Sequence, residues 1–148
     1  MKRIISLLFS FITATILLTS FSSSRSCDLI IRVQNINKLE GNISILIYKS
    51  KDGWPNQYQK AIFTKSIPAS SKEIIQRVDG LPYGTYAIAI LHDINYNKVA
   101  DKSMFGIPQE PFGFSNYPKI TFGVPNFEDV SFLVKSPKQE IIIKMMEI

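Results

Sequence analysis

The sequence contains few of the residues that most often carry chemistry. Among its 148 residues there is one cysteine, Cys27, and one histidine, His92. A single cysteine excludes a disulfide bond within the chain. A single histidine with no second histidine or cysteine beside it argues against a zinc site, which takes several such ligands. Helical periodicity with caps is also absent after Cys27, which argues against an α-helical domain.

Positive charge is less abundant than the totals suggest. The chain has 17 Lys and Arg against 12 Asp and Glu, but Lys2, Arg3 and Arg25 lie before Cys27. From Cys27 onward the net charge is +2. Because this part has no stripe of Lys and Arg, nucleic acid is not expected as a partner.

The N-terminus has the three parts of a secretory signal. A basic start, Met1–Arg3, precedes an apolar stretch over 4–21 and a serine-rich exit. This order predicts a signal peptide over 1–26, followed by a β-sandwich domain over 27–148. The alternative is a retained membrane anchor, since 18 residues approach the lower limit for a bilayer span. We therefore expect an exported protein, periplasmic or extracellular, with possible attachment to the cell envelope.

Cys27 lies where a bacterial lipoprotein would carry its acylated cysteine. The preceding Ser24-Arg25-Ser26 lacks the apolar residue that such a site normally has three positions earlier. Lipidation is therefore the lesser alternative. A membrane is expected as a partner only through an acylated Cys27 or an uncleaved signal.

The rest of the chain reads as short β-strands. Apolar and polar side chains alternate, with β-branched and aromatic residues enriched, over 28–36, 42–50, 61–67, 73–78, 85–92, 130–134 and 140–145. Residues 79–84 contain two glycines and a proline and are predicted to form a turn. Both faces of 85–92 are apolar, which indicates a central strand between packed layers. The pattern predicts an all-β fold, a single antiparallel β-sandwich of about seven strands.

Residues 94–126 form the longest stretch without a clear strand. A connection of this length is usually functional or disordered. Its aromatic residues argue against disorder, because disordered segments are poor in them. These are Phe105, Phe112, Phe114, Tyr117 and Phe122. We expect a long ordered loop.

Oxygen-bearing side chains recur at alternate positions where this loop begins. Asp93, Asn95, Asn97 and Asp101 occupy positions 1, 3, 5 and 9 of a calcium-type loop, and Val99 could add a carbonyl at position 7. Position 6 lacks the usual glycine and position 12 lacks the usual glutamate, although Glu110 could substitute. The alternative is a turn whose Asx side chains bind their own backbone. Calcium is the one cofactor that the sequence predicts.

Three further features could carry function. His92 beside Asp93 suggests a general base, although adjacent strand residues point to opposite faces. Ser115 lies outside any nucleophile elbow and is interpreted as a turn residue. Trp54, Tyr58 and Tyr83 could form a stacking platform for sugar or a partner protein, but single loop aromatics are common.

The order of four motifs resembles one bacterial family. These are Leu81-Pro82-Tyr83-Gly84-Thr85-Tyr86, then His92-Asp93 with Asn95, Asn97 and Asp101, then Phe105-Gly106-Ile107-Pro108 with Glu110, then Gly113-Phe114-Ser115-Asn116. Together they resemble the family called domain of unknown function 2141. The resemblance implies an exported protein without an assigned activity. The first motif is also similar to that of transthyretin-like sandwich modules. The family usually has glycine at the positions of Tyr96 and Lys98.

These observations favour a non-catalytic exported module with a binding or structural role, whose partner would be a protein or another cell-envelope component. Its functional loop would include His92, Glu110, Gly113, Ser115 and Asn116. The alternative function is an enzyme of unknown reaction that uses His92, Asp93 and Glu110 beneath the 94–126 loop.

Overall fold

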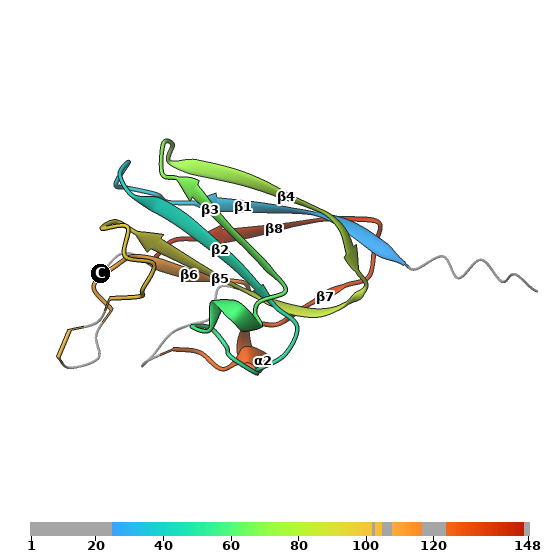
Figure 1. The fold of residues 1–148 in the computed structure, drawn as a ribbon. Helices are drawn as coiled ribbons and strands as arrows, with labels where there is room; N and C mark the ends of the chain where they lie inside the picture. Colours follow the sequence, from blue (N-terminus) through green and yellow to red (C-terminus); the bar gives the residue numbers. More distant parts are fainter. Residues whose placement is uncertain (1–24, 102, 105–107, 117–123, 147–148) are drawn as a thin grey trace, which may run out of the picture.

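Two β-sheets pack face to face in the computed structural model (Figure 1). The structure describes residues 25–101, 103–104, 108–116 and 124–146. Its strands are β1 (Ser26–Gln34), β2 (Asn42–Tyr48), β3 (Phe63–Pro68), β4 (Glu73–Pro82), β5 (Gly84–Asp93), β6 (Phe112–Phe114), β7 (Phe132–Val134) and β8 (Lys138–Lys144). Two short helical turns, η1 (Tyr58–Lys60) and α2 (Phe127–Val130), lie between strands.

The strand order confirms the predicted β-sandwich. One sheet has the order β4-β1-β8, and the other has the order β3-β2-β5-β6, with β7 also pairing with β5. Every pairing is antiparallel except that of β1 with β8, which is parallel. Among the described residues, no helix has the length and apolarity needed to cross a bilayer. The predicted signal peptide lies outside the described residues except for Arg25 and Ser26.

Alternating side chains build the core between the sheets. In β1, Leu29, Ile31 and Val33 are fully buried, whereas Arg32 and Gln34 face outward. The same alternation in β2 and β5 directs isoleucines into this core. Each such side chain contributes roughly 1.5–3 kcal/mol when it is buried completely.

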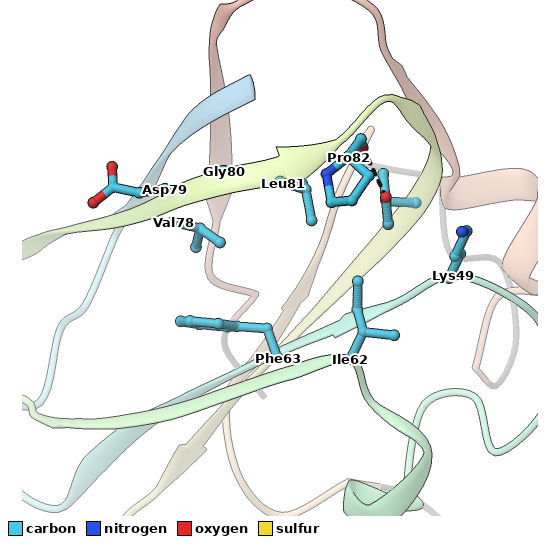
Figure 2. A pocket seen from close by; sticks show the side chains of 9 residues that line it. Lys49, Ile62, Phe63, Val78, Asp79, Gly80, Leu81 and Pro82 are labelled. Atoms are coloured by element: carbon cyan, nitrogen blue, oxygen red, sulfur yellow. Dashed lines mark hydrogen bonds between the residues drawn. The ribbon is translucent and has the colours of Figure 1, made fainter. Parts of the chain in front are cut away.

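The sandwich is open on the side where β3 and β4 form the outer strands. There a cleft of about 400 Å³ lies between the two sheets (Figure 2). Lys65 of β3 is on the same side of the strand as Phe63 and Ile67, which pack against the core. An inward-facing charge on an edge strand discourages edge-to-edge association.

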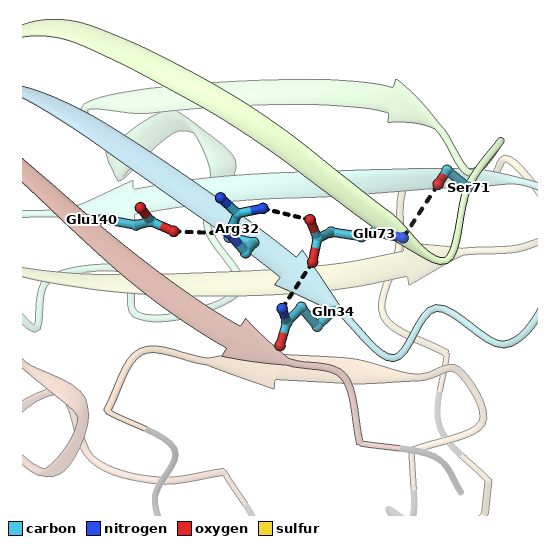
Figure 3. Close-up of polar contacts among 5 residues, drawn as sticks. All are labelled: Arg32, Gln34, Ser71, Glu73 and Glu140. Carbon is cyan, nitrogen blue, oxygen red and sulfur yellow. Dashed lines mark hydrogen bonds and ion pairs between the residues drawn. The ribbon is translucent and has the colours of Figure 1, made fainter.

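One arginine connects all three strands of the smaller sheet on its outer surface. Arg32 of β1 donates to Glu73 of β4 and, at 2.8 Å, to Glu140 of β8 (Figure 3). Gln34 donates to the second oxygen of Glu73 at 2.8 Å. Hydrogen bonds from Gln34 and Arg32 lower the pKa of Glu73.

A second apolar cluster covers the opposite face of β5. It contains Ala87, Ala89, Phe114 and Val130. Trp54 packs against it, with its ring centroid 5.4 Å from that of Tyr48 and 5.5 Å from that of Phe114. Its indole N–H donates to the carbonyl of Pro125 at 2.9 Å. Both faces of β5 are therefore buried, as expected for a central strand, and Trp54 serves as a packing residue.

Three predicted features differ from the structure by more than a shift of one or two residues at a strand end. Residues 79–84 are not a simple turn, because β4 continues to Pro82 through a β-bulge opposite Asp28 with Gly80 at a φ of 69°. The 94–126 stretch contains β6, a strand too short to show alternation. The predicted strand 130–134 begins as the last residue of α2, and only Phe132–Val134 forms β7.

Candidate functional site

The candidate site begins where β5 ends. The side chain of Asp93 is 2% exposed. Its two carboxylate oxygens accept hydrogen bonds from the backbone N–H groups of Asn97 and Lys98, each at 3.0 Å. Tyr96 and Lys98 adopt left-handed conformations with φ of 64° and 60°. These positions are where glycine would relieve strain, so the carboxylate bonds hold a turn that its own residues disfavour.

The remaining residues of the predicted calcium loop form a network around Asp101. The side-chain amide of Asn95 donates to the Asp101 carboxylate at 2.6 Å, and that of Asn97 donates to it at 3.0 Å. The Asn97 side-chain oxygen accepts the backbone N–H of Val99 at 2.7 Å. The structure therefore brings these predicted residues together in a turn closed by Asx hydrogen bonds.

Glu110 joins the two ends of this turn from the other side. It is 5% exposed, although it lies 16 residues beyond the start of the loop. Its carboxylate accepts the backbone N–H of Ile94 at 2.9 Å and that of Asp101 at 3.4 Å. Hydrogen bonds to charged groups contribute about 1.5–3 kcal/mol each. Asp93 and Glu110 together fix the loop to the sandwich.

Tyr58 of η1 belongs to the same surroundings. Its hydroxyl is buried and, within the described part of the chain, has no hydrogen-bond partner of good geometry. Burial raises the pKa of Tyr58, the nearby Ser44 hydroxyl acts in the opposite direction, and the charges of Asp93 and Glu110 raise it further. No sequence pattern indicated this neighbour, because η1 lies more than thirty residues before Asp93.

His92 lies on the other side of β5 from Asp93. It is fully buried, and its ring Nε2 is 2.7 Å from the carbonyl oxygen of Glu40. Its backbone N–H donates to Pro111 at 2.9 Å. The two side chains diverge as the strand period predicts, and the histidine is held in place by backbone groups.

The later residues of the predicted functional loop connect elements of the sandwich. Ser115 is completely buried and its hydroxyl donates to Val130 at 2.6 Å while accepting the N–H of Ile88 at 2.9 Å. Asn116 donates to the carbonyl of Ser131. A Cβ on Gly113 would lie 2.9 Å from a methyl group of Ile143, so this glycine allows β6 to pack closely on β8.

A glycine outside the loop also shapes the site. Gly41 has a φ of 72°, and a Cβ there would lie 2.3 Å from the carbonyl oxygen of Asp93 and 2.6 Å from the Cα of Ile94. Local sequence gave no indication of this contact with the start of the loop. That contact depends on the pairing of Asn42 with Asp93 between β2 and β5.

The described residues contain no group of three or more His, Cys, Asp or Glu side chains placed to hold a metal ion. A cation in this turn would therefore depend on the amide oxygens of Asn95 and Asn97 and on backbone carbonyls, beside the carboxylates of Asp93 and Asp101. Phe105, Gly106, Ile107, Tyr117 and Phe122 lie outside the described residues.

The fold and the site define a two-layer β-sandwich with a loop tied to its end by buried carboxylates. Residues 31–142 match the family described as "Uncharacterized protein conserved in bacteria (DUF2141)". The match covers most of the chain, which belongs to this family. Comparison with curated proteins and with solved structures found no match.

Proposed function

We propose that the protein is an exported, non-catalytic module that binds a protein or another component of the cell envelope through the loop of residues 94–104. The observation that carries the proposal is the contrast between the buried carboxylates and the exposed side chains of this loop. The buried side chains of Asp93 and Glu110 hold the loop by accepting backbone hydrogen bonds. By contrast, Tyr96 is 63% exposed, Val99 is 58% exposed and Met104 is fully exposed.

Exposed apolar side chains on a fixed loop suit recognition. Loops positioned by a rigid scaffold carry binding residues more often than the scaffold does. A fixed loop also loses little conformational entropy when a partner binds. Tyrosine and methionine are enriched at protein interfaces, and apolar clusters on a surface mark contact sites.

The placement of the acidic residues supports binding over catalysis. Asp93 and Glu110 accept backbone N–H groups, and His92 contacts the carbonyl of Glu40. A general acid or base needs a proton or lone pair directed at a substrate. In this arrangement the three side chains contact backbone groups instead.

The exposed side chains of the loop can be tested by a triple substitution, Tyr96→Ser with Val99→Ser and Met104→Ser. Because these side chains are exposed, we expect an unchanged melting temperature. We expect the wild-type protein to co-sediment with cell-envelope preparations and the triple variant to lose at least most of that association.

The matched control is Leu39→Ser with Leu133→Ser, two exposed leucines that lie outside the loop. The control should associate with envelopes as the wild type does. Equal association of the wild type, the triple variant and the control with envelopes would show that the loop is not the binding surface.

Export is the second part of the proposal and rests on the signal-like N-terminus. Fractionation of cells that produce the full chain should place the protein outside the cytoplasm. Mass spectrometry should show loss of about the first 26 residues, as a cleaved signal predicts. Cytoplasmic protein that retains Met1 would contradict export. The transthyretin-like subtype of the sandwich also stays a prediction of the sequence.

Calcium is the third part. We propose that the turn of Asp93, Asn95, Asn97, Val99 and Asp101 takes up calcium at millimolar concentrations. The supporting observation is that both asparagine amides already converge on the Asp101 carboxylate. Rotation of these amides would present their oxygens, the ligand type that calcium prefers. Two carboxylates in the turn suit the weak affinity of extracellular calcium modules.

Melting temperatures in EDTA and in ~5 mM calcium test this part. A Kd near 0.1 mM would stabilise the fold by about 2 kcal/mol, which corresponds to a shift of several degrees. Asp101→Asn should abolish the shift, whereas Glu128→Gln, which removes an exposed carboxylate from α2, should retain it. No shift in the wild type would leave these residues as turn-forming groups alone.

A further inference from the structure

The cleft on the open side of the sandwich lies far from the loop of residues 94–104. Its lining includes Tyr86 near the start of β5, whereas the loop follows the end of the same strand. Tyr86 and Asp93 are seven residues apart on β5, which corresponds to about 23 Å. The cleft is therefore a separate feature, and its role does not depend on the proposed function of the loop.

Side chains from both sheets form apolar walls. Val78 and Leu81 of β4 face Phe63 and Ile62 across the cleft (Figure 2). Ile62 is 49% exposed, although the next residue, Phe63, packs against the core. The hydroxyl of Tyr86 is directed at the carbonyl of Pro82, to which it donates at 2.8 Å. Its polar atom is thus satisfied, and its ring adds to the apolar lining.

One end of the cleft carries a positive charge without an ion-pair partner. Lys49 follows β2 and is exposed, and within the described residues it forms no ion pair. The only carboxylate among the described lining residues, that of Asp79, lies at the opposite end of the cleft from Lys49 (Figure 2) and shares the guanidinium of Arg77 with Asp28. An anionic group at the Lys49 end would therefore meet a free ammonium group and lie away from the carboxylate.

We propose that this cleft binds a single-chain amphiphile with one anionic headgroup, such as a medium-chain carboxylate. The apolar tail lies between β4 and the residues Ile62 and Phe63, and the headgroup lies at Lys49. A volume of about 400 Å³ falls within the range of small-molecule sites, which combine apolar walls with few polar groups.

The strand edges beside the cleft do not suit an added peptide strand. Such a strand needs a regular row of free N–H and C=O groups. The β4 edge is broken by the bulge at Gly80, and Pro82 has no N–H to donate. On the other side, Lys65 faces inward from β3. A small amphiphile does not need to form hydrogen bonds with these strand edges.

Isothermal titration of the purified, exported protein with dodecanoate and with dodecanol tests the proposal. Both should bind the wild type. Lys49→Gln should lower the affinity for dodecanoate by about two- to fivefold, because it removes an exposed ion pair, and should leave the affinity for dodecanol unchanged. Lys51→Gln removes an exposed lysine that does not line the cleft and should change neither affinity.

A second variant tests the apolar walls. Ile62→Glu places a carboxylate between them and should weaken both ligands by at least about tenfold. Circular dichroism checks that this variant folds. If the variant does not fold, Lys49→Glu, which alters only an exposed side chain, tests the site because it should abolish dodecanoate binding. Absence of dodecanoate binding by the wild type would overturn the proposal. Affinity that none of these substitutions changes would overturn it as well.

Discussion

Gly41 and Gly80 offer a direct measurement of how closely β2 approaches the start of the loop of residues 94–104. Both residues have positive φ, 72° and 69°. A Cβ on Gly80 would meet nothing within 4 Å, whereas a Cβ on Gly41 would overlap the backbone of Asp93 and Ile94. The two alanine variants therefore share the conformational cost and differ in the steric one.

We expect Gly80→Ala to lower the free energy of unfolding by about 1–2 kcal/mol, the cost of a left-handed conformation for an ordinary residue. Gly41→Ala should lose that amount and about 1–3 kcal/mol more, because backbone atoms must move to admit the methyl group. Urea unfolding followed by Trp54 fluorescence measures both values, and an unchanged m-value confirms that the midpoints are comparable.

Equal losses for the two variants would refute the reasoning. They would mean that β2 and the end of β5 do not approach as closely as the structure places them. A loss confined to Gly80→Ala would refute it more strongly, since the unhindered position would then be the costly one.

Three further outcomes follow from buried or paired groups. The Cys27 thiol is buried in the core, and burial raises its pKa. A thiol reagent should therefore react with it only as fast as the protein unfolds. Rapid reaction would place Cys27 outside the sandwich. The folded-state pKa of Glu73 is lowered, so the stability that this carboxylate contributes is present above about pH 4.5 and is lost as the pH falls through the folded-state pKa. The urea midpoint of Glu73→Gln should therefore decline less steeply with acid than that of the wild type. Parallel declines of the two midpoints would contradict this. Burial raises the pKa of Tyr48 from 10.0 to about 12, so the stability that its neutral hydroxyl contributes is complete below pH 10 and is lost between about pH 10 and 12. Tyr48→Phe should make the loss of stability over this range less steep. A tyrosinate absorbance titration centred at pH 10 for all tyrosines would exclude the effect.

Side-chain alternation was sufficient to predict the long strands. In β1 and β2 every second residue is apolar, and the pleat places those residues in the core. The short elements could not be predicted in this way. β6 has three residues with a glycine at its centre, and it forms because β5 offers an unpaired edge beside it. That edge is a property of the assembled sheet.

The candidate site was predictable only in part. The spacing of Asp93, Asn95, Asn97 and Asp101 identified a turn, because residues this close in sequence share one local geometry. Glu110 was named as a possible member, but its contacts depend on how the chain returns to the end of β5. The contact of Gly41 comes from strand register, which local sequence does not encode.

Backbone hydrogen exchange in the loop tests most directly whether buried carboxylates hold it to the sandwich. The amides of Ile94, Asn97 and Lys98 should exchange slowly in the wild type, since each donates to Glu110 or Asp93. In Asp93→Asn, in which only one side-chain oxygen remains, at least one of Asn97 and Lys98 should lose protection while Ile94 keeps it. Exchange of all three amides at the rate of an unstructured chain in the wild type would contradict the account.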